Sequence, residues 1–306
     1  METNNNKEFI FKKCQAYKED FPEIQKDLNI FLNFKGILKY PIESPIDQKI
    51  DNQSKSFIDD VFFRNYLQDM PVDYILSKTN FYGIEFNVNY DVLIPRPETE
   101  LIIDYLIESV GSKSIIVDAG TGSGCIGITA AKKFPSSKVF GIDKSFSALN
   151  IAQQNQLELD CKNLYLIQSD WLKCFKGNSI DIILANPPYL RSSDLHLNSL
   201  QWEPENALVS GDTGIECFEE IFSQSKSILK KDGFLIVEHG YDQHRGLVDL
   251  ATNVNLRVID SIIDYQNFNS NEEFNNTNIA ATLLKIQERK TAKGNSYAVL
   301  KLTDLT

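Results

Sequence analysis

The pattern of apolar and polar positions divides the chain into two parts. Residues 57–70, FIDDVFFRNYLQDM, place large apolar side chains at helical spacing, which predicts one amphipathic helix. Residues 81–94, FYGIEFNVNYDVLI, alternate apolar and polar positions after an early glycine, which predicts a hairpin or an extended arm. From residue 97 onwards, short apolar runs alternate with helical segments.

The second part of the chain has the pattern of a layered α/β domain. Strands are predicted at 114–118, 138–143, 164–170, 179–186 and 233–240, with helices between them. Short runs rich in Ile, Val and Leu that are separated by helices are typical of a parallel sheet with both faces covered. We therefore predict a doubly wound α/β fold.

Composition and charge narrow the class of protein. The 306 residues are 42% hydrophobic and 24% charged, with a formal net charge of −11. A protein that binds a long polyphosphate normally presents basic residues, so the acidic balance argues against a nucleic-acid partner. The sequence has neither a secretory signal nor an apolar run near the roughly 20 residues of a membrane span, so we expect a cytoplasmic protein without a membrane partner. The five cysteines are scattered without a C-x-x-C pair, which indicates no disulfide framework and no metal site.

A glycine-rich loop follows the first predicted parallel strand. It consists of Asp118, Ala119, Gly120, Thr121, Gly122, Ser123 and Gly124. Glycines let the backbone pass close to a ligand, and the unpaired N–H groups that open the next helix can face a carboxylate or a phosphate. Asp143 ends the following strand, where an acidic side chain can accept hydrogen bonds from both ribose hydroxyls. This combination predicts a site for a nucleoside cofactor.

A second motif, Asn186-Pro187-Pro188-Tyr189, follows the apolar strand at 179–186. Loops at the carboxyl ends of parallel strands face the ligand site, and the two prolines restrict the backbone around Asn186. The side-chain oxygen of Asn186 and the carbonyl of Pro187 can accept both hydrogens of a planar nitrogen and orient it for reaction. Tyr189 can pack against the planar group, so the motif predicts binding of an amide or an aromatic amine.

The spacing G-x-G-x-G after an aspartate resembles motif I of class I S-adenosylmethionine methyltransferases. The resemblance implies S-adenosylmethionine as cofactor and a mostly parallel sheet whose last strand is antiparallel. It also assigns the adenine to Asp170 and Trp171, with the carboxylate meeting the exocyclic amine and the indole covering the ring. Asn186 joins the glycine loop and Asp143 as a cofactor-binding residue.

Residues 93–100, LIPRPETE, resemble the signature of the release-factor glutamine methyltransferases, the HemK family. Residues 71–76, PVDYIL, look like that family's domain junction. Further matches are Glu203-Pro204, Ala207-Leu208, Asp212-Thr213-Gly214 and Glu238-His239-Gly240. The resemblance implies methylation of N5 of the glutamine in the Gly-Gly-Gln loop of peptide chain release factors, with the substrate bound by Asn186, Pro187, Pro188 and Tyr189. We expect Arg96 to pair with a nearby carboxylate rather than to contact the substrate.

Two other functions remain as alternatives. The N-P-P-Y motif also occurs in enzymes that methylate the N6 amine of adenine in nucleic acids, although the net charge and the L-I-P-R-P-E-T-E arm oppose this function. An inactive binding protein with a methyltransferase fold is the other alternative, opposed by the complete glycine loop, Asp143 and N-P-P-Y.

The resemblance also suggests how the chain is organised. We expect a helical domain at 1–78 that engages the substrate, a hairpin or linker arm at 79–96, a methyltransferase domain at 97–287 and an atypical tail at 288–306. Residues 255–264 and 279–286 are predicted to be the two arms of the hairpin that closes the sheet. The tail around Lys293-Gly294 resembles the first hairpin of the OB-fold module of bacterial replicative DNA polymerase α subunits, but it is too short for a five-stranded barrel. We expect the chain beyond Arg289 to be dispensable.

Overall fold

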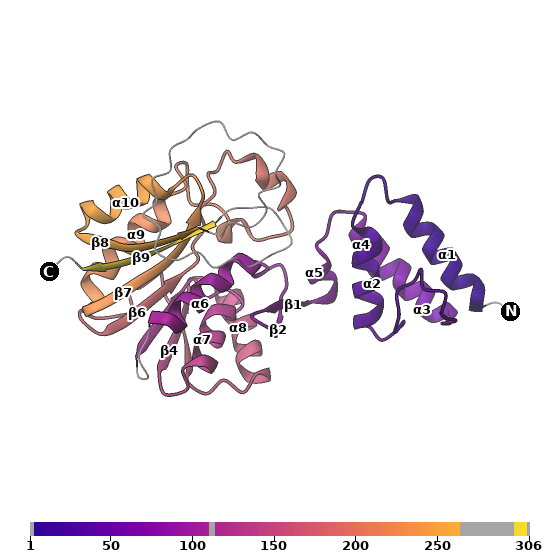
Figure 1. Cartoon of the computed structure of the whole chain (residues 1–306), viewed down its shortest axis with the longest axis horizontal. Helices are drawn as coiled ribbons and strands as arrows, with labels where there is room; N and C mark the ends of the chain where they lie inside the picture. The colour runs from indigo at the N-terminus through magenta and orange to yellow at the C-terminus, as the bar shows by residue number, and fades with distance from the viewer. Residues whose placement is uncertain (1–2, 110–113, 264–296, 305–306) are drawn as a thin grey trace. The chain divides into compact units, whose positions relative to one another are not determined.

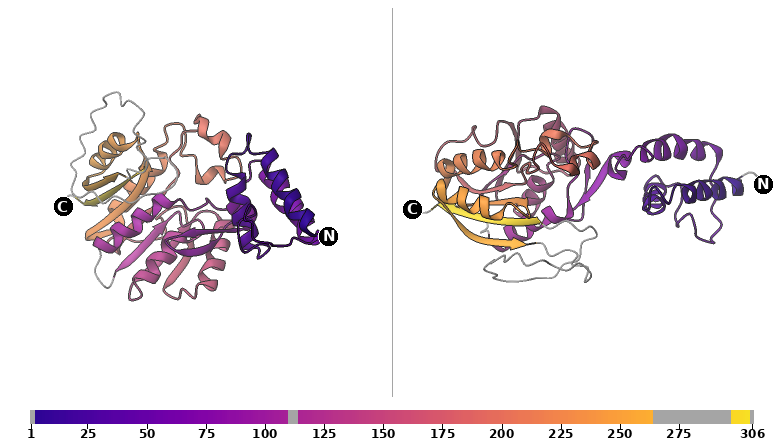
Figure 2. Two further views of the ribbon diagram at one scale, coloured as in Figure 1. Left: turned by 45° about the vertical axis from the view of Figure 1, so that its right-hand side comes forward. Right: turned by 90° about the horizontal axis from the view of Figure 1, so that it is seen from above.

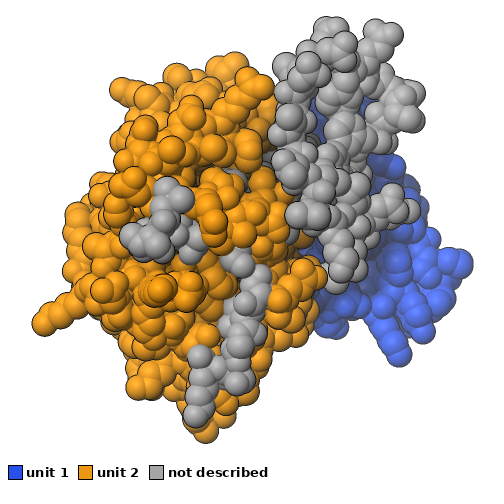
Figure 3. Space-filling view, turned by 60° about the vertical axis from the view of Figure 1, so that its left-hand side comes forward, with its two compact units in different colours: residues 1–79 blue, residues 80–306 orange. Residues whose placement is uncertain are grey.

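The computed structural model describes residues 3–109, 114–263 and 297–304 (Figure 1). The chain divides into two compact units, Met1–Thr79 and Asn80–Thr306, coloured separately in Figure 3. Within the described residues, no helix combines the length and the apolar content that crossing a bilayer requires.

The first unit is helical. Its elements are α1 (Thr3–Ala16), α2 (Ile24–Phe34), α3 (Asn52–Phe57), the π-helical η1 (Ile58–Phe63), α4 (Arg64–Tyr66) and α5 (Val72–Leu76). The helix predicted at 57–70 corresponds to the later part of the run formed by α3, η1 and α4, which ends at Tyr66, four residues before the predicted end. This run begins earlier than predicted because the Asp51 carboxylate caps it, accepting the backbone N–H of Ser54 at 2.6 Å. Phe31, Phe62 and Phe63 are fully buried, and the rings of Phe31 and Phe62 lie 5.3 Å apart between centroids.

A two-stranded sheet spans the point in the chain where the first unit ends and the second begins. It consists of β1 (Lys78–Phe81) and β2 (Ile84–Asn87), so the segment predicted at 81–94 to be a hairpin or an extended arm contains a hairpin that begins three residues earlier and ends at Asn87. The connecting residues Tyr82 and Gly83 both have positive φ angles, 54° and 73°, as tight hairpin turns require. Phe81 and Phe86 are buried in the hydrophobic core of the second unit.

The main sheet of the second unit has seven strands in the order β5-β4-β3-β6-β7-β9-β8. Their bounds are β3 (Ile115–Ala119), β4 (Lys138–Asp143), β5 (Leu164–Gln168), β6 (Ile180–Ala185), β7 (Leu229–Gly240), β8 (Leu256–Ile263) and β9 (Tyr297–Asp304). Strands β3 to β7 pair in parallel, whereas β9 runs antiparallel to both of its neighbours. The predicted doubly wound fold is confirmed. The strand order reverses beside β3, which opens a crevice at the carboxyl ends of β3 and β6.

Helices lie on both faces of this sheet (Figures 1 and 2). They are η2 (Pro97–Thr99), α6 (Glu100–Ser109), α7 (Cys125–Lys133), α8 (Phe146–Glu158), η3 (Leu195–Ser199), η4 (Glu205–Ala207), α9 (Glu216–Ile228) and α10 (His244–Asn253). Consecutive residues of β3 show why two layers form. Ile116 packs in one core cluster with Leu106 of α6, and Val117 packs in the other with Phe218 of α9. Because side chains alternate along a strand, a fully apolar strand needs a cover on each face.

The last strand of the sheet differs from the prediction. Residues 297–304 form β9, paired between β7 and β8, so the strand expected from residues 279–286 and the dispensable chain beyond Arg289 are both corrected. The run at 279–286 was predicted because its apolar content suits insertion between buried strands. The later run, YAVLKLTD, also begins with four apolar residues, and strand pairing depends on the backbone. Residues 279–286 and the segment around Lys293-Gly294 lie outside the described residues.

Candidate functional site

The loop between β3 and α7 is held from within by Asp118. This side chain is fully buried, and its Oδ2 accepts hydrogen bonds from the Thr121 hydroxyl at 2.6 Å and from the Gly127 backbone N–H at 2.8 Å. A Cβ on Gly127 would come within 2.9 Å of Asp118 Oδ2, so glycine is needed there. Burial raises the pKa of Asp118 to about 7. Asp118, predicted to bind the cofactor, therefore supports the loop.

The glycines of the loop have the conformations for which they were predicted. Gly120, Gly122 and Gly124 have φ angles of +78°, +53° and +83°, the left-handed region that favours glycine. A Cβ on Gly122 would meet nothing within 4 Å, whereas one on Gly124 would come within 3.1 Å of the Ile128 side chain. Gly122 therefore has open space beside its backbone, and Gly124 allows α8 to pack closely, because a Cβ there would also come within 3.3 Å of Ala152.

Asp143 connects the end of β4 to this loop. Its Oδ2 accepts the backbone N–H of Gly122 and its Oδ1 accepts that of Ser145, both at 2.9 Å. Burial raises the pKa of Asp143, and the two backbone N–H groups act in the opposite direction. Each carboxylate oxygen has a further lone pair, so Asp143 can still accept hydrogen bonds from a ligand.

One pocket brings most of the predicted site together. It is lined by residues 91–93, 120–123, 125–126 and 206–207, and by Pro95, Thr99, Asp143, Ser145, Ala148, Asn186 and Pro188. The glycine loop, Asp143 and the N-P-P-Y segment thus face a common space. Asp118, Gly124, Asp170, Trp171, Pro187 and Tyr189 are predicted site residues that do not line this pocket.

Asp170 and Trp171 make other contacts. The indole of Trp171 lies over Gly120, where an added Cβ would come 3.2 Å from the ring. The Asp170 carboxylate pairs with Lys173 and lies 3.6 Å from the ammonium of Lys144. The hydrogen bond from Lys173 lowers the pKa of Asp170. The adenine-binding role of these two residues stays a prediction.

Asn186 follows β6 directly and is tied to the arm that precedes α6. Its Nδ2 donates a hydrogen bond to the Thr99 hydroxyl oxygen at 3.0 Å, and both residues line the pocket. Pro187 is buried, whereas Pro188 faces the pocket. The ring of Tyr189 is partly buried against the core cluster of α9 and α10.

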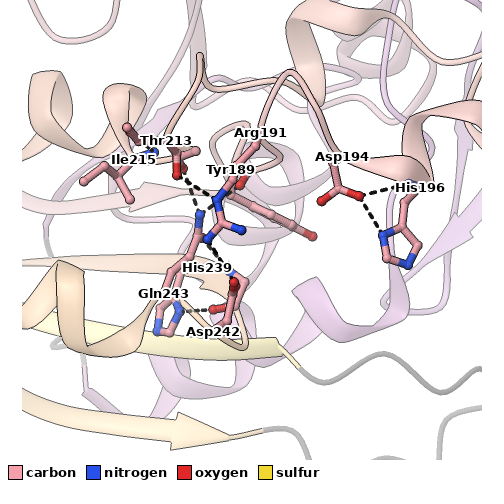
Figure 4. A network of polar contacts seen from close by, with 11 residues as sticks. Tyr189, Arg191, Asp194, His196, Thr213, Ile215, His239, Asp242 and Gln243 are labelled. Carbon is pink, nitrogen blue, oxygen red and sulfur yellow. Dashed lines mark hydrogen bonds and ion pairs between the residues drawn. The ribbon is translucent and has the colours of Figure 1, made fainter.

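Gln243 joins the N-P-P-Y segment to the loop at Gly214 and to the end of β7 (Figure 4). Its Nε2 donates to the carbonyl oxygens of Tyr189 at 2.8 Å and Gly214 at 2.9 Å, and its Oε1 accepts the backbone N–H of Gly240 at 3.0 Å. The residue is only 6% exposed. A single buried side chain therefore sets the spacing between the ends of β6 and β7.

The arm on the other side of the pocket is held by an ion pair. Arg96 pairs with Glu203, as expected, and a second Glu203 oxygen accepts the backbone N–H of Ile94 at 3.1 Å. The pair joins residues that are 107 positions apart in the chain. It therefore links the last residues of the arm, 91–96, to the loop at 203–207. Both segments contribute residues to the lining of the pocket.

Sequence reasoning assigned no role to several residues that shape this site. Thr99, Glu203 and Glu238 stood only within motifs that match the family, and Gln243 carried no signal at all. Glu238 is fully buried near Asn186, and burial raises the pKa of its carboxyl to about 7.

Comparison with known proteins agrees with the fold and the motifs. The family described as "Methyltransferase domain" matches residues 111–293, more than half of the chain. A release factor glutamine methyltransferase of Coxiella burnetii is 33% identical over 201 residues, covering 65% of this chain and 73% of the relative. One of Buchnera aphidicola is 32% identical over 265 residues, covering 85% of this chain and 95% of the relative.

Among solved structures, a methyltransferase from Pyrococcus furiosus superposes with a TM-score of 0.50 at 14% sequence identity, covering 81% of this chain and 98% of that one. This likeness concerns the fold alone. The methyltransferase domain and the class I fold make S-adenosylmethionine the cofactor. By its identity of 33% and 32% to relatives of which it covers 73% and 95%, the chain belongs to the family of release factor glutamine methyltransferases.

Proposed function

We propose that the protein transfers a methyl group from S-adenosylmethionine to the side-chain nitrogen N5 of the glutamine in the Gly-Gly-Gln loop of peptide chain release factors. The names of the relatives support this substrate. The observation that carries the proposal is the shared pocket, because Asn186 and Pro188 face the same space as the glycine loop and Asp143. A nucleoside cofactor and an amide can therefore meet there.

The pocket suits the cofactor chemically. The carboxylate of Asp143 would accept hydrogen bonds from the ribose hydroxyls. The open space beside Gly122 would let the cofactor approach the backbone closely. Residues 120–123 would contact the cofactor directly, with Asp118 and Gly124 shaping the loop, and Asp170 and Trp171 would hold the adenine. When bound, S-adenosylmethionine supplies an electrophilic methyl group on a sulfonium.

The N-P-P-Y segment would prepare the glutamine. An amide nitrogen is a poor nucleophile because its lone pair is delocalised. Asn186 Oδ1 and the Pro187 carbonyl would accept the two N–H hydrogens, orienting the nitrogen and stabilising the charge that develops as it becomes tetrahedral. Tyr189 would pack against the planar amide. The hydrogen bond from Asn186 Nδ2 to Thr99 supports this role, because it leaves Oδ1 as the acceptor.

The test is intact-mass analysis of a release factor incubated with the protein and S-adenosylmethionine. We expect one added methyl group, located by peptide mapping on the Gly-Gly-Gln glutamine. Duplex DNA in a parallel reaction with labelled cofactor should gain none, and label on adenine but not on the release factor would overturn the proposal in favour of an adenine methyltransferase. Cofactor binding without transfer to either substrate would favour an inactive binding protein.

The Asn186→Ala variant tests the mechanism. Removing one preorganised hydrogen bond to the reacting group should lower kcat on the order of 10²–10³-fold. The Kd for S-adenosylmethionine, measured by calorimetry, should change much less than kcat, because Asp143 and the glycine loop keep most of the cofactor contacts. Near-full turnover by this variant would contradict the assigned role of Asn186.

The helical first unit is the part of the chain that we propose engages the release factor. It exposes Phe9, Phe34 and Phe57, each between 40% and 48% accessible, and exposed aromatic side chains are common at protein interfaces. Because release factors act in translation, the cytoplasm is the expected location.

A further inference from the structure

Glu238 is a buried carboxyl group that the proposed reaction does not use. It lies near the end of β7 and is 0% exposed. Within the described part of the chain, neither of its oxygens has a hydrogen-bond partner at a normal distance and angle. Burying a carboxylate without hydrogen bonds is costly, and such groups are rare in folded proteins. Its position therefore needs an explanation.

The neighbours of Glu238 belong to the candidate site. Ala185 of β6 pairs in register with Val237 of β7, so the next residues, Asn186 and Glu238, stand side by side at the carboxyl edge of the sheet. The side chains of Thr99 and Asn186 are close enough to Glu238 to lower its pKa. Their distances or angles lie outside those of a normal hydrogen bond. Asn186 in turn donates to the Thr99 oxygen at 3.0 Å.

Two charged side chains from the segment before α6, Glu98 and Arg96, act on Glu238. Glu98 raises the pKa of Glu238 and Arg96 lowers it. On β7 itself, burial lowers the pKa of His239 to about 4, so that ring is neutral near pH 7, and its Nδ1 contacts the Gly240 carbonyl at 2.8 Å. The side-chain hydrogen-bond donors that lower the pKa of Glu238 are Thr99 and Asn186.

We propose that Glu238 is a positioning residue that fixes the orientation of the Asn186 side-chain amide. An ionised carboxylate can only accept hydrogen bonds. It therefore draws the Thr99 hydroxyl hydrogen towards itself, and the Thr99 oxygen is left to accept from Asn186 Nδ2. Asn186 Oδ1 is then the atom available to the pocket. This inference rests on the proposed function, because a flipped Asn186 would present N–H groups to the N–H groups of the glutamine.

The direction of this chain of hydrogen bonds depends on the charge of Glu238. Once protonated, the carboxyl can donate to the Thr99 oxygen, and the Thr99 hydroxyl can then donate to the Asn186 oxygen. This reversal favours the flipped amide. Because burial raises the pKa of Glu238 to about 7, turnover should fall as the pH is lowered through that value and level off above it.

The experiment compares Glu238→Gln with Glu98→Gln in the full-length protein, using a release factor as substrate. Glutamine keeps the size of the side chain but can both donate and accept, so the direction of the chain is no longer fixed. We expect kcat of Glu238→Gln to fall on the order of 10²-fold, as a small misplacement of a reacting group typically causes. Its inflection in kcat near pH 7 should disappear, while the Kd for S-adenosylmethionine is kept.

Glu98→Gln is the matched control, because Glu98 is a neighbouring carboxyl that is only 6% exposed and whose pKa is also raised by burial. It should keep turnover at high pH and keep an inflection in kcat, moved to lower pH because the negative charge that raises the pKa of Glu238 has been removed. Thr99→Val breaks the same chain without altering the carboxyl, and should reproduce the loss of kcat. The double variant Glu238→Gln with Thr99→Val should lose little more kcat than either of its single variants, as expected for residues that act as one unit.

The outcomes are distinct. Wild-type turnover and an unchanged inflection in Glu238→Gln would overturn the inference, and so would an equal loss in Glu98→Gln, which would indicate a general electrostatic effect. Should Glu238→Gln fail to fold, full turnover by Thr99→Val would overturn it instead. Absence of methyl transfer by the wild-type protein would refute the proposed function, which is a separate result.

Discussion

Replacing Glu203 with alanine should weaken both the fold of the second unit and the binding of its substrate. The Glu203 side chain is 2% exposed, and its carboxylate holds the Arg96 guanidinium together with the backbone N–H of Ile94. Alanine removes both contacts at once. The arm and the loop around η4 would then lose the link between two walls of the pocket.

The size of the effect follows from these two contacts. A hydrogen bond to a charged group contributes about 1.5–3 kcal/mol, and leaving a buried N–H unsatisfied costs about 1–3 kcal/mol. The contacts share one carboxylate, so they do not add fully, and breaking a buried pair by removing one partner costs about 3–5 kcal/mol. This is a large part of the roughly 5–15 kcal/mol that stabilises a typical domain. Glu203→Gln keeps an acceptor for the Ile94 N–H, so its loss in free energy of unfolding should be about half that of Glu203→Ala.

Urea unfolding followed by tryptophan fluorescence measures the stability, since both tryptophans, Trp171 and Trp202, belong to the second unit. The midpoint should fall in the order wild type, Glu203→Gln, Glu203→Ala. The value of kcat/KM for the release factor should fall in the same order, because residues 91–93 and 206–207 line the pocket. A Glu203→Ala variant with the wild-type midpoint and the wild-type kcat/KM would refute this reasoning.

Three further predictions concern other parts of the second unit. Asp143→Ala should raise the Kd for S-adenosylmethionine about 10- to 100-fold by calorimetry, the equivalent of one charge-assisted hydrogen bond, and an unchanged Kd would exclude its ribose role. Gln243→Met removes the contacts to Tyr189, Gly214 and Gly240 at similar volume; we expect a lower kcat with the cofactor Kd retained, and normal turnover would show that this anchor is unnecessary. Truncation after Arg289 removes β9, which pairs with seven residues each of β7 and β8, and should yield insoluble protein; an active truncated protein would contradict the observed strand order.

Much of the fold could be predicted because buried parallel strands leave a strong pattern. The run KVFGID at 138–143 coincides with β4, and the other four predicted parallel strands differ from the observed ones mainly at their ends. Strand β7 starts four residues earlier than predicted, in a segment that carries two lysines and an aspartate. Helix α10 was not predicted, although Leu247, Leu250 and Ala251 stand at helical spacing and contact the core, because the segment of ten residues is short.

The site could be predicted only as far as its motifs are local. The glycine loop, the aspartate at the end of β4 and the N-P-P-Y motif can each be recognised from a few consecutive residues. The pocket brings all three together. The contacts that hold them are long-range: Gln243 binds a residue 54 positions away, and Arg96 binds one 107 positions away. No local pattern specifies such pairs. An aspartate at a strand end also indicates ligand contact and loop support equally well, so the supporting role of Asp118 became clear only from its burial.

The position of β9 matters for the candidate site. In the observed register, β9 pairs Val299 with Glu238 and Tyr297 with Gly240. The backbone of β9 therefore flanks the part of β7 that carries Glu238 and donates the Gly240 N–H to Gln243. The inferred orientation of Asn186 and the anchor of Tyr189 both depend on where this part of β7 lies. Residues near the C-terminus, which sequence reasoning treated as an appendage, thus support the catalytic edge of the sheet.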